Sequence, residues 1–518
     1  MKTDDYRRDY AAYSAALERA RYDYRAGVEP ELRLAPLRDR YADLWTRAAV
    51  DDLTRALEET SLQFDTERTA LSALLRAAQL GYAEAQAAEV TGELTRCCAS
   101  VSFEWNGLTF AAHEGRDALA AEPDAARGRE LAARWFDSLL ACDDLRAARL
   151  DALRAAARSL GFDSYFNLLS GLDGETGVES LSAGAAAFLE HTARAYHTNL
   201  SAWAVRHLPA EFARSPAYPD ALRLAQLTHL EGYFHEGYLR STYEATMRDL
   251  RIRPAQQTNL RVEATSGESR RAPARCFPVS PPDDVRLVYD ETRGASSYQT
   301  LFEAAGRAQH FAWLSRDLSA RYPEFVHAHD EATRAGFAFL FGDLLADRTW
   351  LAAHRQVRPS EADEIARSFA LFELHRTRRA CVVLQHERAL EDAPDARAEQ
   401  LGASYATALE EATGFSAHPA LHLHDLIPFG LHAAQTVDAP LPPAVHLRAR
   451  LFATALGEYL RTRYGHRWWS TNKVADELID MWNTGSRYTV EELASLAGLG
   501  SLSFDLLADS INSTLTRE

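Results

Sequence analysis

SSYQTLFEAAGRAQHFAW, residues Ser296–Trp313, is the stretch of sequence that decides the fold. Its apolar residues recur at helical spacing, and serine is a residue type that caps helix N-termini, so we expect a helix whose N-cap is Ser296 or Ser297. Within this helix Glu303 and Arg307 are four residues apart and therefore share one face. A helix can hold a metal ion with two side chains at this spacing, provided that both donate a lone pair.

A second segment, DEATRAGFAFLF (Asp330–Phe341), is mostly apolar after its first turn and is also expected to be helical. Together the two segments resemble the active-site helices of zinc oligopeptidases related to oligoendopeptidase F and thimet oligopeptidase and, more distantly, to angiotensin-converting enzyme. In such enzymes the first helix carries H-E-x-G-H followed by A-x-H, and the second carries a metal-binding glutamate in a pattern like D-N-x-V-T-E-G-x-A-F-L-F. The residues that match are Gly306, Ala308 and His310 in the first segment and 336–341 in the second.

The positions that would bind zinc are the ones that differ. By the resemblance, Glu303 stands at the first histidine, Ala304 at the catalytic glutamate and Arg307 at the second histidine. Ala335 stands at the glutamate of the second helix, and Glu331, one turn earlier, is an alternative ligand position. Arginine stays protonated and has no lone pair to give, and alanine is neither a ligand nor a base. The resemblance therefore implies a metallopeptidase relative that has lost its zinc site, with no cofactor expected.

Further segments extend the resemblance over about Val101–Leu507. FELHRTRRACVVLQHERAL (Phe372–Leu390) is similar to a family helix, R-R-x-A-A-K-L-x-Y-E, with His386 where tyrosine is usual. The segment 446–469 is similar to Y-L-R-A-W followed by F-G-x-x-W-W. Tyrosines near the start of that helix hydrogen-bond the tetrahedral intermediate in such enzymes. Here His446 occupies the stretch, so the resemblance implies that this role is also lost.

The fold that these features predict is mainly α. The resemblance implies a two-lobed helical metallopeptidase fold, of the gluzincin and oligopeptidase type, with a deep central channel and one small β element. We divide the chain into an N-terminal helical region (1–100), a helical lobe (101–250), a small β insertion (251–297) and a second helical lobe (298–518). Short β-like runs at Leu260–Ala264 and Val285–Tyr289 lie in the insertion, and an Asn106–Gly107 turn predicts a hairpin over Val101–Phe110.

Composition limits the partners. The formal net charge of −17 opposes binding to phosphate backbones, so no nucleic-acid partner is expected. The polar start, MKTDDYRRDY, has no apolar signal region, and no run of about 18 apolar residues occurs, so neither export nor membrane insertion is expected. The sequence predicts a cytoplasmic protein. Its cysteines (Cys97, Cys98, Cys142, Cys276 and Cys381) form no CxxC pair, and we expect them to be buried reduced thiols.

One histidine-rich segment offers a competing metal site. HPALHLHDLIPFGLH contains His418, His422, His424, Asp425 and His432. The first two are spaced as a ligand pair, but a proline directly after His418 disfavours a helix through it. We expect polar or channel-lining histidines and leave metal binding by the cluster as the alternative.

Three functions remain open. The first is a pseudoenzyme that binds a peptide, a protein or a small ligand in its channel without hydrolysing peptide bonds. The second is an enzyme of repurposed chemistry that uses Glu303, Arg307, His310 and His446. The third is zinc-dependent oligopeptidase activity through a rearranged site. We expect Glu303, Arg307, Ala335 and His446 to line one concave site. In a site that has lost its zinc, we expect Glu303 and Arg307 to form an ion pair at the former metal position.

Overall fold

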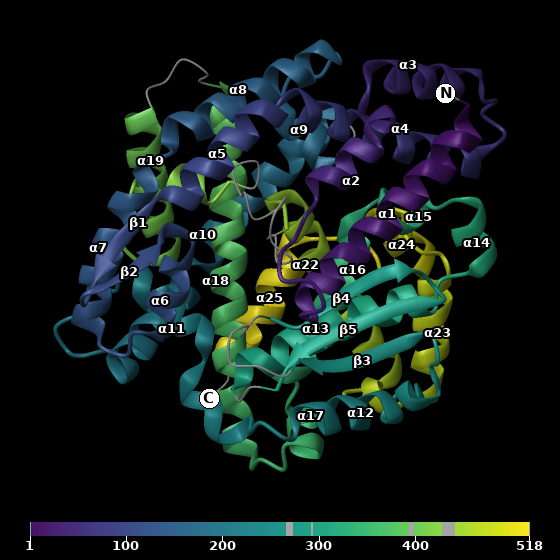
Figure 1. Ribbon diagram of the computed structural model, residues 1–518. Coiled ribbons are helices and arrows are strands. Elements are labelled where there is room, and N and C mark those ends of the chain that lie inside the picture. The colour runs from purple at the N-terminus through teal and green to yellow at the C-terminus, as the bar shows by residue number, and fades with distance from the viewer. Residues whose placement is uncertain are drawn as a thin grey trace. The chain divides into compact units, whose positions relative to one another are not determined.

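The computed structural model describes residues 2–172, 174–265, 273–291, 294–392, 398–426 and 441–516. These residues are mostly helical, which confirms the predicted fold class (Figure 1). The chain forms two compact units, each built from separate segments. The first unit contains Met1–Tyr82, His229–Arg367 and Arg448–Leu507, and the second contains Ala83–Thr228, Ser368–Leu447 and Ala508–Glu518.

The elements of the first unit surround a small sheet. Its helices are α1 (Thr3–Arg25), α2 (Ala35–Arg40), α3 (Arg47–Glu59), α12 (Leu239–Asp249), α13 (Ala295–Ala312), α14 (Arg316–Arg321), α15 (Glu324–His327), α16 (Glu331–Gly342), α17 (Arg348–His354), α23 (Asn472–Asn483) and α24 (Val490–Ala497). The helices α4 (Asp65–Gln86), α18 (Pro359–Asp392), α22 (Pro443–Tyr464) and α25 (Phe504–Leu515) contribute residues to both units.

The sheet has the strand order β3–β5–β4, formed by β3 (Leu260–Thr265), β5 (Asp284–Asp290) and β4 (Arg275–Ser280). The central strand β5 runs parallel to β3 and antiparallel to β4. Its residues 285–289 are all buried, because helices cover the sheet. In Figure 1, α1 crosses beside β4, while α13 packs against β4, β5 and α16. The prediction of a small β element within this region is confirmed.

The start of α13 differs from the sequence prediction. The N-cap is Gly294, with a φ of 112°, and the expected capping serines lie inside the first turn. Glycine adopts this backbone conformation without strain, so the chain enters the helix two or three residues earlier than a serine cap would allow. The rest of α13 is helical to Ala312, as the periodicity predicts.

The second unit holds a hairpin and a cluster of helices. Its hairpin, β1 (Ser102–Trp105) and β2 (Leu108–Ala111), turns at Asn106 and Gly107 as predicted. Its helices are α5 (Ala88–Ser100), α6 (Gly115–Ala121), α7 (Ala125–Leu140), α8 (Asp143–Ser159), α9 (Tyr165–Ser170), α10 (Gly174–His207), α11 (Tyr218–Gln226), α19 (Ala398–Thr413) and α20 (Leu421–His424). The apolar core of the unit includes Trp135, whose indole N–H donates to the carbonyl of Ala112 at 2.8 Å.

The expectation that all cysteines are reduced is wrong. Cys97, at the end of α5, forms a disulfide with Cys142, which is the N-cap of α8. Sequence spacing did not indicate this pair, because 45 residues separate its members and only tertiary packing brings them together. Cys98 is half-buried, and Cys276 and Cys381 are buried thiols, in line with the expectation for those residues.

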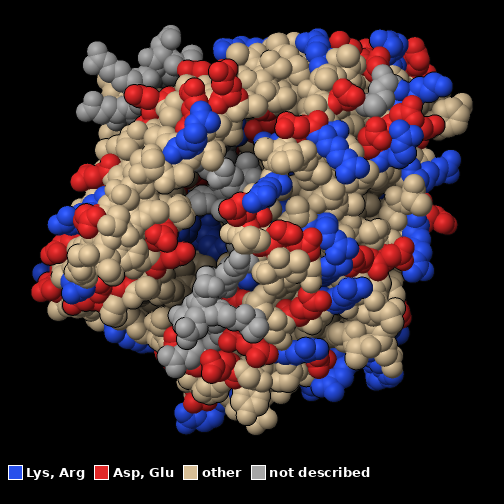
Figure 2. Space-filling view, viewed as in Figure 1, with Lys and Arg blue, Asp and Glu red and all other residues tan. Residues whose placement is uncertain are grey.

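Two whole-chain properties bear on partners. None of the helices in the described ranges is long and apolar enough to cross a membrane. On the face shown in Figure 2, acidic and basic side chains are intermingled across a largely uncharged surface. That no nucleic acid binds remains a prediction from the net charge.

Candidate functional site

The helices α13 and α16 pack side by side at unusually close range. A Cβ atom placed on Gly306 would lie 2.3 Å from the carbonyl oxygen of Phe337 and 2.9 Å from the Cα of Ala338. Only a residue without a side chain allows the two backbones to approach this closely. The glycine that matches the family pattern therefore has a structural reason to be present, which is independent of any metal.

The two helices run antiparallel, so each position of α13 meets a definite level of α16. Glu303 lies against Gly342, where its Cγ would be 2.9 Å from an added Cβ, and its carboxylate accepts a hydrogen bond from Gln299 Nε2 at 3.4 Å. Ala335 lies seven residues before Gly342, about 10 Å along the helix at 1.5 Å per residue. Ala335 and Glu303 are thus on paired helices but not directly opposite each other. Ala335 is also fully buried among its neighbours.

Arg307 points to a different neighbourhood from Glu303. It lies close enough to Cys276 of β4 for its charge to act on that thiol: burial raises the pKa of Cys276, and Arg307 is the first of the charges that oppose this shift. The predicted ion pair between Glu303 and Arg307 is therefore wrong for the described residues, where the two side chains do not meet. The reason is that α13 lies between two layers, with Glu303 turned to α16 and Arg307 near the sheet.

Arg307 is half-buried, and within the described ranges its guanidinium forms neither a hydrogen bond nor an ion pair. Two other arginines, Arg275 and Arg334, also lower the pKa of Cys276, so they lie in the same neighbourhood. Glu18 of α1 acts on this thiol in the opposite direction, and it pairs with Arg21 at 2.7 Å. Arg307 is therefore one of three arginines whose charges act on Cys276.

His310 is a packed side chain rather than an exposed base. It is 1% exposed, and its ring lies 5.4 Å from that of Phe337 and 5.5 Å from that of Phe311. Burial lowers the pKa of His310 to about 3, so it is neutral at physiological pH. These contacts make it a component of the α13–α16 interface.

The side chains at the positions that the sequence resemblance aligns with metal ligands do not fit a zinc ion. Glu303 offers one oxygen donor group, whereas Arg307 and Ala335 offer none. Nowhere in the described part of the chain do three histidine, cysteine, aspartate or glutamate side chains come together as a group that could hold a metal ion. Glu331, the alternative ligand position, lies in the first turn of α16.

The sequence analysis does not predict the buried ion pair between Asp330 and Arg448 at the start of α16. Asp330 caps α16 through the N–H of Ala332 and also accepts two hydrogen bonds from Arg448 of α22, at 2.9 and 2.7 Å. It further accepts from the N–H of Val490, at the start of α24. Burial alone would raise the pKa of Asp330, but Arg448 and these N–H groups outweigh it and lower the pKa. An aspartate directly before an apolar helix was the available signal for the cap, whereas Arg448 is 118 residues away.

His446 lies in the first turns of α22, in a segment that belongs to the second unit, and is 8% exposed. Its place beside Glu303 and Arg307 remains a prediction. The same holds for the concave site as a whole.

The described part of the histidine-rich segment packs its histidines against aromatic rings, in place of the alternative ligand pair His418 and His422. His418 stacks on Phe136 at 4.8 Å, and the ring of His422 lies 5.7 Å from that of His386. Proline after His418 does prevent a helix there, since α20 begins at Leu421. Burial lowers the pKa of both His386 and His422 to about 4. His432 lies outside the described residues.

Asp425 organises the polar groups around these histidines. Its carboxylate pairs with Arg379 at 2.6 Å and accepts from the hydroxyl of Tyr405 at 2.7 Å. The ring of Tyr405 in turn lies 4.5 Å from that of His386. The tyrosine position of the family pattern is thus filled by a histidine that packs against another tyrosine.

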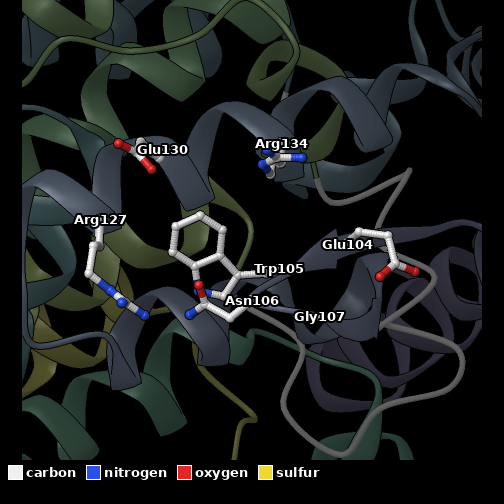
Figure 3. A pocket seen from close by; sticks show the side chains of 7 residues that line it. All are labelled: Glu104, Trp105, Asn106, Gly107, Arg127, Glu130 and Arg134. Carbon is white, nitrogen blue, oxygen red and sulfur yellow. The ribbon is translucent and has the colours of Figure 1, made fainter.

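A shallow pocket of about 340 Å³ opens in the second unit between the hairpin and α7 (Figure 3). It is lined by Glu104, Trp105, Asn106, Gly107, Arg127, Glu130 and Arg134. Arg127 lies 5.6 Å from the Trp105 ring centre and pairs with Glu122. The charged side chains that line the pocket are exposed and of both signs, so the pocket shows no preference for an anionic or a cationic ligand.

No family model and no curated protein sequence matches the chain. Its structure nevertheless resembles solved structures over nearly its whole length. Metallocarboxypeptidase 1 of Trypanosoma cruzi aligns with a TM-score of 0.64 at 13% identity over 99% of both chains. The M32 carboxypeptidase of Deinococcus radiodurans R1 aligns with 0.62 at 12% identity over 99% of this chain and 97% of that one. A putative oligoendopeptidase F aligns with 0.63 at 12% identity over 98% and 90%. The chain therefore has the helical metallopeptidase fold found in M32 carboxypeptidases and oligoendopeptidase F.

Proposed function

We propose that this protein is a metallopeptidase-like pseudoenzyme that binds peptides through their terminal carboxylate at Arg307 and does not hydrolyse them with zinc. The observation that carries the proposal is the half-buried guanidinium of Arg307, which has no hydrogen-bond or ion-pair partner among the described residues. A sheltered, unpaired cation is costly unless a ligand completes its hydrogen bonds.

The chemistry of the ligand follows from the guanidinium. Its planar N–H fork matches a carboxylate in two parallel hydrogen bonds, which is a strong and oriented contact. Arg334 is a further cation that acts on the same Cys276 thiol, and Glu18 pairs with Arg21. An anionic group is therefore favoured over a cation or a neutral amide.

A peptide carboxylate is favoured over other anions by the fold. Two of the similar structures are carboxypeptidases by name, and that name implies action at the carboxyl end of a chain. If this chain also binds peptides by their carboxyl end, Arg307 contacts the carboxylate. Ala304 offers no catalytic base and Ala335 no metal ligand, so the bound peptide is not hydrolysed with zinc. Peptide binding would then survive without catalysis.

The proposal is tested by binding peptides that differ only at their end. A fluorescent peptide with a free carboxylate and its amidated twin would be titrated into the full chain. We expect the free form to bind roughly tenfold or more tightly, the range of one hydrogen-bonded charge. Arg307→Gln should abolish that preference, whereas Arg307→Lys should keep part of it.

The matched control is Arg316→Gln, which removes an exposed arginine of the same unit that pairs with Asp283. It should leave the preference unchanged. Equal binding of the two peptides to the unmodified chain would contradict the proposal. Chelator-sensitive cleavage of either peptide would favour zinc peptidase activity, and chelator-insensitive cleavage would favour an enzyme of repurposed chemistry.

A further inference from the structure

The disulfide of the second unit has a third cysteine beside it. Cys97 and Cys98 are neighbours in the last turn of α5, and Cys142 lies at the junction of α7 and α8. Cys97 carries the cross-link, and its Sγ lies 3.8 Å from the carbonyl oxygen of Ala141. Cys142 is 2% exposed, so its sulfur is reached most easily from within the protein.

Cys98 faces the same junction. Its Sγ lies 3.9 Å from Nη2 of Arg146, on the first turn of α8. Arg146 Nη1 in turn donates to the carbonyl of Leu139, in the last turn of α7, and pairs with Asp143, the residue that follows Cys142. Arg146 is thus fixed to the junction, and it holds the third sulfur there.

The backbone of Cys97 is within disulfide range of Cys142, and Cys98 is the next residue of the same helical turn. The Cα atoms of Cys97 and Cys142 are 6.1 Å apart, within the range of disulfides, and the Cα of Cys98 is one step of about 3.8 Å further along the chain. Both cysteines lie in the final turn before α5 ends at Ser100. Final turns fray at little free-energy cost, so the rotation that brings the second sulfur forward is accessible.

We propose that Cys142 exchanges its disulfide partner between Cys97 and Cys98, so that the second unit carries one of two alternative disulfides. In the exchange the Cys98 thiolate attacks the Cys142 sulfur, the Cys98–Cys142 bond forms and the Cys97–Cys142 bond breaks. Cys97 leaves as a thiolate and takes up the proton that Cys98 released. No oxidant or reductant is consumed. A direct Cys97–Cys98 bond is not part of the exchange, since neighbouring cysteines have poor disulfide geometry.

The rate of this exchange depends on the fraction of Cys98 that is present as a thiolate. Burial raises the pKa of the Cys98 thiol, and the charge of Arg146 opposes that shift. Since the thiolate is the attacking species, the exchange should accelerate as pH rises. Cys97 and Cys98 should accordingly both be modified by thiol reagents, each in its own fraction of the molecules.

Variants of the full chain test whether the Cys98–Cys142 disulfide forms. Each would be equilibrated with reduced and oxidised glutathione, blocked with N-ethylmaleimide and digested with trypsin without reduction. Cleavage after arginine places Cys97 and Cys98 in peptide 97–116 and Cys142 in peptide 135–146. We expect these peptides to be cross-linked in Cys97→Ser and in Cys98→Ser, and separate in the double variant. Separate peptides in a folded Cys97→Ser variant would overturn the proposal.

A measurement on the unmodified chain covers the case in which Cys97→Ser does not fold. The native protein would be treated slowly with iodoacetamide, and fragmentation of peptide 97–116 would locate the label in chains whose Cys142 is still cross-linked. The proposal predicts some chains labelled at Cys98 and others at Cys97. A label found at Cys98 alone would overturn it.

Discussion

At the scale of single residues, Glu303 and Arg307 of α13 lie in different neighbourhoods. Glu303 lies against α16 near Gly342, and Arg307 lies near Cys276 of the sheet. That Arg307 and Ala335 offer no metal donor follows from the sequence alone, whereas their correspondence to metal positions stays a prediction. The direction of the Glu303 and Arg307 side chains could not be predicted from sequence, since it depends on the layers that pack on either side of α13.

Glu324 gives a testable pH dependence in the first unit. It is fully buried, pairs with Arg7 at 2.9 Å, and burial raises its pKa to about 7 from 4.5. Between these values the folded chain keeps a proton that the unfolded chain releases, so stability should fall as pH rises through about 4.5–7. The contribution is on the order of 3 kcal/mol. Thermal unfolding of Glu324→Gln should show a correspondingly weaker loss of stability over this window.

The control for that experiment is Glu31→Gln, an exposed glutamate paired with Arg33 at 2.9 Å. It should unfold with the same pH profile as the unmodified chain. An unchanged profile in Glu324→Gln would show that Arg7 keeps Glu324 ionised in the folded state. Sequence could not reveal this pair, because 317 residues separate its members.

At the scale of elements, the contact between α13 and α16 should be intolerant of any side chain at Gly306. In Gly306→Ala the new methyl group would meet the Phe337 carbonyl, a backbone atom that cannot turn aside. We expect a loss of roughly 1–3 kcal/mol or more in the free energy of unfolding, measured by urea denaturation.

Gly92→Ala is the matched control, since that position on α5 has only the end of Arg96 nearby, at 3.6 Å. Alanine should there stabilise the helix by about 0.5–1 kcal/mol. A Gly306→Ala chain as stable as the unmodified one would mean that the two helices can move apart freely.

The ion pair at the start of α16 should be strongly stabilising once formed. Arg448→Ala leaves the buried Asp330 carboxylate without its cation, and we expect a loss of about 3–5 kcal/mol in unfolding free energy. Arg463→Ala removes an exposed arginine from the same helix and should change stability by less than about 1 kcal/mol. Similar effects in the two variants, measured by the same denaturation, would contradict this account.

Most elements could be predicted from the sequence, because the signals that specify them are local. Helical periodicity, the Asn106–Gly107 turn and the β-like runs near Leu260 and Val285 are local signals, and the structure confirms them. The serine cap of α13 was wrong because Gly294 permits an earlier start. The likeness to carboxypeptidases became visible only in three dimensions, at 12–13% identity.

At the scale of the whole molecule, the chain divides into two units that are each discontinuous in sequence. The disulfide closes a long loop wholly within the second unit. Its reduction should remove about 4 kcal/mol from the stability of that unit, on a chain-entropy estimate. Hydrogen exchange after reduction should therefore quicken in α5, α7 and α8 and stay unchanged in α13 and α16. Uniform quickening in both units would show that they unfold as one.

The central claim is that the family's metal positions no longer hold zinc, and zinc stoichiometry tests it most directly. The purified full chain would be equilibrated with zinc, freed of excess metal and analysed by mass spectrometry beside its Glu303→Gln variant. Because Arg307 and Ala335 offer no donor, the account predicts far less than one zinc per chain, with no difference between the two proteins. One zinc per chain that is lost in Glu303→Gln would contradict it.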